Sequence, residues 1–289
     1  MGIDFKAWRK KTYKNVSLEM VGDHIMIVYF DKPPVNVGDW DTVISFDEIY
    51  RGIREDDDIR CIINSGKDTP YKGKHYFCAG ADIKQWSGRD KDMPGIPRPP
   101  VRPMIFPRHN FECEAGFLAS KPFISMVNGT AVGFGADWIL ISDIAIASED
   151  ARIGWTYIRV GIPPYEGGTW LLPRRVSVNI AMELLTTGRI IDADEALRLG
   201  IFNKVVPHNQ LRDATLELAT WYAEKGPPLA IGATRSLIWQ GLTQGFHQHL
   251  QAVELAEGCV GPDRREAMAA WVEKREPHYE YKGAPGRGG

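Results

Sequence analysis

Residues 121–141 read KPFISMVNGTAVGFGADWILI, and the rest of the chain can be understood outward from them. An apolar run, Phe123–Val127, enters a turn with glycines at positions 129, 133 and 135, and a second apolar stretch begins at Trp138. A strand that breaks on glycines and restarts as a helix leaves backbone N–H groups unpaired at the helix N-terminus. Those donors can bind a phosphate or hold the negative charge that develops on a carbonyl oxygen.

The spacing of the glycines favours the carbonyl. Their order is G-x-x-x-G-x-G, whereas a dinucleotide site carries G-x-G-x-x-G and a P-loop ends in Gly-Lys-Ser/Thr. An earlier turn of small residues, Ala79-Gly80-Ala81, closes a β-rich segment and precedes the acidic residue Asp82. Two such turns in one domain would be able to direct two N–H groups at one oxygen atom.

Three motifs in combination resemble the crotonase (enoyl-CoA hydratase/isomerase) superfamily. They are FCAGADIK at 77–84, K-P-x-I-x-x-V-N-G-x-A-x-G-x-G at 121–135 and G-I-P-P-x-x-G-G-T at 161–169. The resemblance covers about residues 16 to 279 and implies a spiral of ββα units. We therefore expect a crotonase-like α/β core over 1–206 and a C-terminal helical region over 207–289 that serves in trimerisation and covers the active site.

Composition describes an ordinary globular protein. The chain has 289 residues, 44% of them hydrophobic, and a net charge of −2, which argues against nucleic-acid binding. No apolar run approaches the ~20 residues that span a bilayer, and the N-terminus lacks the apolar core of a secretory signal. The four cysteines show no C-x-x-C spacing, so we expect reduced thiols and a cytoplasmic protein. The resemblance implies no cofactor beyond the coenzyme A of the substrate.

The periodicity of apolar residues predicts strands and helices up to about residue 206 and helices alone after it. Asp56-Asp57-Asp58 is expected to be a solvated turn, and the proline-rich residues 88–110 a long surface loop that either lines the site or is a tolerated insertion. The expected elements are a hairpin over 14–30, strands at 59–65, 123–127, 143–147 and 202–206, and helices at 41–53, 177–187, 192–200, 211–225, 229–242, 246–258 and 264–275.

The resemblance implies an oxyanion hole made by the backbone N–H groups of Ala81 and Phe134. Where the family commonly has three consecutive glycines, this chain has Gly133-Phe134-Gly135, so the Phe134 ring is expected to shape the pocket. Turns that only start helices are the alternative. The resemblance also implies contacts with the substrate or its coenzyme A from Val37, Ala79, Asp82, Ile83, Lys84 and Gly133.

Three side chains are candidates for catalysis. Asp137 stands where many family members carry a catalytic Glu, and helix capping is its alternative role. Tyr157 stands at the position of the second hydratase Glu; a phenol with a pKa of ~10 would orient water more readily than take its proton, and an ordinary core aromatic is the alternative. Glu166 lies in a loop where some members of the family use an acidic residue. Its alternative role is that of a solvated loop Glu.

No metal site is predicted. His75 and His109 have neither an H-E-x-x-H motif nor a cysteine partner in the sequence.

The resemblance, together with these candidate residues, predicts an acyl-CoA enzyme, a hydratase/isomerase-like lyase that we expect to hydrate or isomerise an unsaturated acyl-CoA, including cyclic or bulky ones. The first alternative is hydrolytic carbon–carbon cleavage, a ring opening of a cyclic keto-acyl-CoA or β-diketone, which Glu166 suggests. The second is a non-catalytic crotonase-fold protein that binds CoA esters, which the missing second Glu suggests. The resemblance implies a homotrimer or a dimer of trimers, without nucleic-acid or membrane partners.

Overall fold

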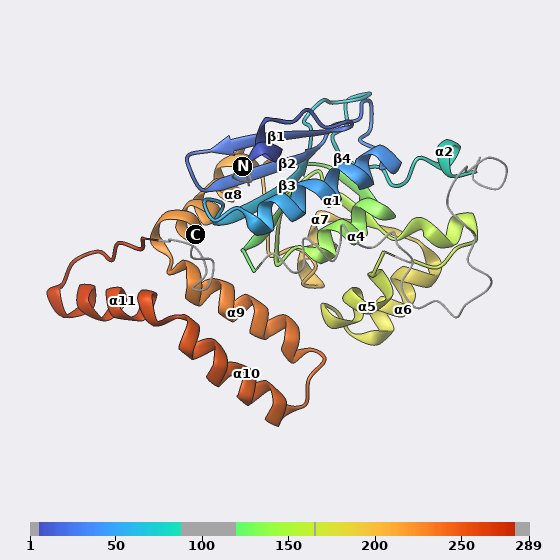
Figure 1. Cartoon of the computed structure of the whole chain (residues 1–289). Helices are drawn as coiled ribbons and strands as arrows, with labels where there is room; N and C mark the ends of the chain where they lie inside the picture. Colours follow the sequence, from blue (N-terminus) through green and yellow to red (C-terminus); the bar gives the residue numbers. More distant parts are fainter. Residues whose placement is uncertain (1–5, 88–119, 165, 281–289) are drawn as a thin grey trace, which may run out of the picture.

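The computed structural model describes residues 6–87, 120–164 and 166–280, and its α/β part is built on two sheets (Figure 1). The main sheet has the strand order β1-β2-β3-β5-β7-β10. β1 and β2 form an antiparallel hairpin, and each following pair is parallel. The strands are β1 (Val16–Val21), β2 (Ile25–Phe30), β3 (Cys61–Gly66), β5 (Phe123–Val127), β7 (Ile144–Ser148) and β10 (Lys204–Val206).

The second sheet consists of short strands in the order β4-β6-β8-β9. β4, β6 and β8 are parallel, and β9 is antiparallel to β8. Three residues are too few to show the alternation that marks a strand, so the sequence does not predict β6, β8 or β9. The bounds are β4 (Tyr76–Cys78), β6 (Thr130–Val132), β8 (Arg152–Gly154) and β9 (Ile190–Asp192).

Both faces of the main sheet are covered, which explains the continuous apolar sequence of β2. Met26, Val28 and Phe30 point into the core that contains α1 (Trp40–Glu55) and α4 (Phe134–Ile141). The intervening residues of β2 point to the other face, where α8 (Leu211–Thr220) packs. The prediction of a mixed α/β core is confirmed.

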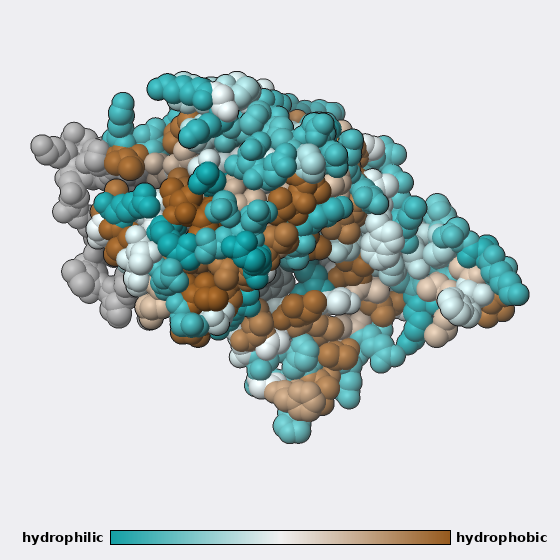
Figure 2. Space-filling view, turned by 180° about the vertical axis from the view of Figure 1, so that it is seen from behind, coloured by the Kyte–Doolittle hydropathy of each residue, from teal (hydrophilic) through white to brown (hydrophobic). Residues whose placement is uncertain are grey.

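The helical region after β10 has two parts. α8 and the π-helix η6 (Trp221–Lys225) lie against the sheet and α9 contacts the body through Arg235 and Trp239, whereas α10 and α11 project from the body (Figure 1). Hydrophobic residues lie among hydrophilic ones on the surface (Figure 2). Large apolar side chains on the projecting helices are exposed, among them Phe246, Leu255 and Trp271. The remaining helices are α2 (Ile83–Ser87), α5 (Gly168–Leu171), α6 (Val178–Thr187), α7 (Ala193–Arg198), α9 (Pro228–Gly241), α10 (Phe246–Cys259) and α11 (Gly261–Glu273), with 3-10 turns at Ala7–Lys10, Thr156–Val160, Leu172–Arg174 and His208–Gln210.

One local prediction is wrong. Asp56 is 1% exposed rather than solvated, because Arg9 reaches it from the N-terminal segment and donates from both Nε and Nη2 to its carboxylate. The Arg9–Asp56 ion pair could not be predicted from the sequence, because the two residues are 47 positions apart. The proline-rich residues 88–110 lie outside the described ranges. Among the described helices, none combines the length and the apolar character needed to cross a bilayer.

Candidate active site

Two turns of small residues meet at one end of the second sheet. β4 and β6 are parallel neighbours, so the turns that follow them, 79–81 and 133–135, leave the same edge. A Cβ added to Gly133 would lie 3.9 Å from Cα of Gly80, and one added to Gly80 would lie 3.2 Å from the carbonyl oxygen of Val132. The two predicted turns are therefore in contact.

The first turn is held by the segment that precedes α1. Gly38 N donates to Gly80 O at 2.8 Å, and Asp82 N donates to Gly38 O at 2.8 Å. This is the parallel-bridge pattern that pairs Gly38 with Ala81, in which the N–H of Ala81 itself points away from its partner strand. Within the described residues this N–H has no hydrogen-bond acceptor.

The second turn starts α4. Gly133 is the N-cap with φ of +53°, a conformation that favours glycine, and Phe134 is the first helical residue. The N–H of Phe134 is one of the unpaired donors at the start of α4 and has no acceptor in the described part of the chain. Gly135 lets the helix approach β4, since a Cβ there would come within 2.5 Å of Cys78 O.

The ring of Phe134 lies in the core. It is 5% exposed and packs edge-on against Phe30, with its centroid 5.8 Å from that of Trp138. A Cβ on Gly38 would be 2.7 Å from its Cδ1. The ring thus anchors the start of α4, in place of the expected pocket-shaping role.

Asp137 lies one helical turn further along α4 and is 1% exposed. Its Oδ2 accepts the Tyr157 hydroxyl at 2.7 Å, and its Oδ1 accepts Trp155 Nε1–H at 2.9 Å. Burial raises the pKa of Asp137 to about 7, and the two hydrogen bonds only partly oppose this. Of the alternative role, the first-turn position of Asp137 is confirmed, but Asp137 does not cap α4, because the N-cap is Gly133 and no side-chain cap hydrogen bond is formed.

Tyr157 reaches Asp137 from the 3-10 helix η3 (Thr156–Val160), which follows β8. Its ring is 5% exposed, so it is a core aromatic that also carries a hydroxyl to a carboxylate. Trp155, the residue before η3, was missed in the sequence analysis. Trp155 and Tyr157 are two positions apart, but the chain turns into η3 between them, so the alternation of an extended strand does not pair their side chains in the sequence.

Glu166 lies directly before the glycine pair 167–168 and is 4% exposed, so a solvated loop Glu is wrong. Gly168 is the point of closest approach: an added Cβ would lie 2.3 Å from Asp137 Oδ1 and 3.2 Å from Trp155 Cδ1. The loop that carries Glu166 therefore packs against the Asp137 cluster.

The predicted substrate-contacting residues surround the first turn. Ala79 N donates to Val35 O at 3.1 Å, which places the backbone around Val37 beside this turn. Asp82 forms an ion pair with Lys32 at 2.8 Å, whereas Ile83 and Lys84 are exposed at the start of α2. The described residues around Asp137 contain no cluster of His, Cys, Asp or Glu that could hold a metal ion.

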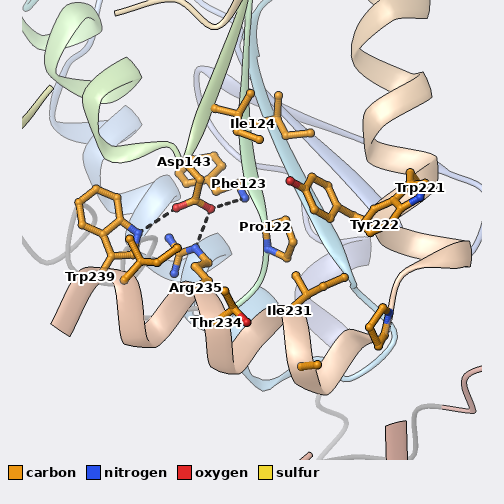
Figure 3. A pocket seen from close by; sticks show the side chains of 14 residues that line it. Pro122, Phe123, Ile124, Asp143, Trp221, Tyr222, Ile231, Thr234, Arg235 and Trp239 are labelled. Atoms are coloured by element: carbon orange, nitrogen blue, oxygen red, sulfur yellow. Dashed lines mark hydrogen bonds and ion pairs between the residues drawn. The ribbon is translucent and has the colours of Figure 1, made fainter. Parts of the chain in front are cut away.

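A separate apolar cavity of about 460 Å³ lies at the amino ends of β5 and β7, beside η6 and α9 (Figure 3). Asp143 in its wall accepts from Arg235 Nε at 2.7 Å and from Trp239 Nε1 at 2.9 Å. This cavity shares no lining residue with the Asp137 cluster and is therefore not the predicted active site.

Comparison with known proteins identifies the family. The enoyl-CoA hydratase/isomerase family profile matches residues 21–282. The short-chain-enoyl-CoA hydratase of Clostridium acetobutylicum is 32% identical over 265 residues, 91% of this chain and 96% of that protein. The (E)-benzylidenesuccinyl-CoA hydratase of Thauera aromatica is 32% identical over 270 residues, 91% of this chain and 98% of that protein.

A crystal structure of enoyl-CoA hydratase from Bacillus anthracis matches the fold with a TM-score of 0.81 and 30% identity, over 93% of this chain and 100% of that one. The spiral α/β core that the motifs predicted is thus the crotonase fold. The chain belongs to the enoyl-CoA hydratase/isomerase family.

Proposed function

We propose that this protein hydrates an unsaturated acyl-CoA thioester, with Asp137 as the acid and base. The observation that carries the proposal is a buried carboxyl with a pKa of about 7, one helical turn from Phe134 and its unpaired N–H. A group that is half ionised near neutral pH can both accept and return a proton. The hydratases among the relatives support the same reaction class.

The N–H groups of Ala81 and Phe134 would hold the thioester oxygen. Asp137 removes a proton from water while the water oxygen bonds to Cβ of the substrate, and the electron pair of the double bond moves toward the thioester. The resulting enolate oxygen is stabilised by the two donors, each of which typically contributes about 3 kcal/mol. Asp137 then returns the proton to Cα, so that H and OH have been added.

Tyr157 and Trp155 would position the carboxylate. They occupy one lone pair on each oxygen of Asp137, and each carboxylate oxygen has a second lone pair for water or substrate. Isomerisation needs only the same base, which would move a proton from one substrate carbon to another. Val37, Ala79, Asp82, Ile83, Lys84 and Gly133 are proposed to line the substrate and its coenzyme A, which is the only cofactor we propose.

Hydrolytic carbon–carbon cleavage is the second candidate, and the burial of Glu166 beside Gly167 and Gly168 favours it. A second acid near Asp137 could activate water against a ketone carbon of a cyclic keto-acyl-CoA. The exposed apolar side chains of α9–α11 support the further proposal that three copies, or two sets of three, assemble through these helices.

The test is turnover of crotonyl-CoA and of a cyclic keto-acyl-CoA in oxygen-18 water, followed by product mass. The proposal expects one heavy oxygen in hydrated crotonyl-CoA, a reaction about 10²–10⁴-fold slower with Asp137→Asn, and retained hydration with Glu166→Gln. Ring opening that is lost in Glu166→Gln would favour the second candidate instead. Binding of both thioesters without turnover of either would favour a non-catalytic role and overturn the proposal.

A further inference from the structure

The fold brings two histidines and an aspartate together outside the active site. Asp68 follows β3, His75 precedes β4, and His208 begins the 3-10 helix η5 (His208–Gln210). His75 Nδ1 lies 2.5 Å from one Asp68 oxygen, and His208 Nε2 lies 3.2 Å from the other. The three ligand atoms lie within 4.8 Å of one another.

Neighbouring groups orient this cluster. Ser148 Oγ lies 3.3 Å from His208 Nδ1, which leaves Nε2 directed at Asp68. The imidazole rings are 3.9 Å apart between centroids, and Asn128 Nδ2 donates to Asp68 at 3.5 Å. Partners on the second ring nitrogen and on the carboxylate are what fix the ligands of a metal site.

The backbone beneath His75 is rigid. Its carbonyl oxygen accepts the Thr130 N–H at 3.0 Å, and Gly129 packs so closely that an added Cβ would lie 2.1 Å from that oxygen. One ligand therefore sits on the sheet itself. The other two come from the segments that follow β3 and β10, so an ion between them would join three parts of the chain.

We propose that Asp68, His75 and His208 bind a divalent transition-metal ion of the Zn²⁺ class. Two imidazoles and one carboxylate are ligands that such ions prefer, with bonds of about 2.0–2.2 Å that leave the ligand atoms roughly 3.3 Å apart. The present separations require movements of about an ångström. The side chains of His75 and His208 are 24% and 25% exposed and that of Asp68 is 53% exposed, so they can rotate and an ion can enter.

The site is independent of the proposed function. His75 precedes β4, whereas the Ala79–Ala81 turn follows its other end, so the ion would stabilise the strand without touching the thioester. No sequence motif joins these residues, because Asp68 and His208 lie 7 and 133 positions from His75, and the fold brings them together.

The experiment uses tag-free, metal-stripped protein titrated with Co²⁺ by visible absorption and with Zn²⁺ by calorimetry. One ion should bind per chain, and His208→Gln and Asp68→Asn should each weaken binding at least about tenfold. His247→Gln, on the exposed face of α10, is the matched control and should leave the dissociation constant unchanged.

Melting curves without metal show whether each variant is folded, and Zn²⁺ should raise the melting temperature of the wild type and of His247→Gln alone. The proposal is overturned if no saturable site is found in the folded wild type. It is equally overturned if His75→Gln and His208→Gln, both folded, bind Zn²⁺ as tightly as the wild type.

Discussion

Two buried aspartates near the starts of α1 and α4 differ in what surrounds them. Asp39 is 3% exposed and Asp137 is 1% exposed. Burial acts to raise the pKa of Asp39, but hydrogen bonds from Lys32, Thr42 and Asn15 bring it to about 2. Among the described residues, only Trp155 and Tyr157 donate hydrogen bonds to Asp137. Both donors are neutral, and its pKa rises to about 7.

The comparison separates a structural carboxylate from a reactive one. Asp39 is the N-cap of α1, accepts the Thr42 N–H at 2.9 Å and forms an ion pair with Lys32 at 2.7 Å. Its negative charge is fully compensated, so it has no tendency to take a proton near neutral pH. In the described part of the chain no cation donates a hydrogen bond to Asp137, and burial without a cation is what makes a carboxyl exchange protons at pH 7.

Replacement of each aspartate by asparagine should show the difference between the two residues most clearly in catalytic activity. Asp137→Asn removes the proton acceptor, so we expect kcat to fall by about 10²–10⁴-fold. Asp39→Asn keeps a good capping residue and should leave kcat within a few-fold. Steady-state kinetics with the acyl-CoA that the wild type turns over measures both, and an Asp137→Asn enzyme of full activity would remove this residue from the mechanism.

The two substitutions, Asp137→Asn and Asp39→Asn, should have opposite effects on the stability of the folded protein at pH 8. The folded pKa of Asp137 lies above its unfolded value of 3.8, so ionisation destabilises the folded state as pH rises from about 4 to about 7. At pH 8 Asp137→Asn should therefore be more stable than the wild type by on the order of a few kcal/mol, and the gain should vanish toward pH 4.

The folded pKa of Asp39 lies below 3.8, so its stabilisation is present above pH 3.8 and is lost as pH falls through about 2. Asp39→Asn should accordingly be less stable than the wild type at pH 8. Urea unfolding of the three proteins at pH 5 and pH 8 measures this, and a loss of stability in Asp137→Asn at pH 8 would count against the raised pKa.

Gly38 lies between the two regions, beside Asp39 and under the ring of Phe134. A Cβ there would come within 2.7 Å of the ring, so Gly38→Ala should force the start of α4 to move and cost roughly 1–3 kcal/mol, with a fall in kcat. Gly258→Ala in α10 meets no atom within 4 Å and is the control. Thermal melting and kinetics should separate the variants; equal behaviour would show that Phe134 is not held by this contact.

Tyr157 should produce the smallest change, because its hydrogen bond only tunes the carboxyl. The bond favours the ionised form, so Tyr157→Phe should raise the pKa of Asp137 further. A rise of one unit would lower kcat/KM about tenfold at pH 6, where the ionised fraction limits the rate, and leave it nearly unchanged at pH 9. A pH–rate profile measures the shift, and movement of the inflection to lower pH would contradict it.

Much of the fold follows from local sequence, because long apolar strands and amphipathic helices leave periodic patterns. The hairpin β1–β2 and helices α8–α11 were found this way, with shifts of a few residues at their ends. The three-residue strands β6, β8 and β9 were not, since strands this short are stabilised by their neighbours rather than by a pattern of their own.

Part of the candidate site could likewise be predicted from the sequence, and part could not. The resemblance pointed to Asp137 and Tyr157 by position, and the structure adds that they are hydrogen-bonded to each other. The pKa of Asp137 depends on burial and on Trp155, which only the folded chain reveals. His75 and His208 lie 133 positions apart by their numbers, so no local spacing could have joined them.

The most direct test is a titration of the Asp137 carboxyl by NMR of protein labelled with carbon-13 at the aspartate Cγ, with Asp137→Asn providing the assignment. A midpoint near pH 7 is predicted, well separated from that of Asp39. A midpoint near the ordinary aspartate value of about 4 would contradict the account, because the Asp137 carboxylate would then be too weak a base to take a proton from water efficiently near neutral pH.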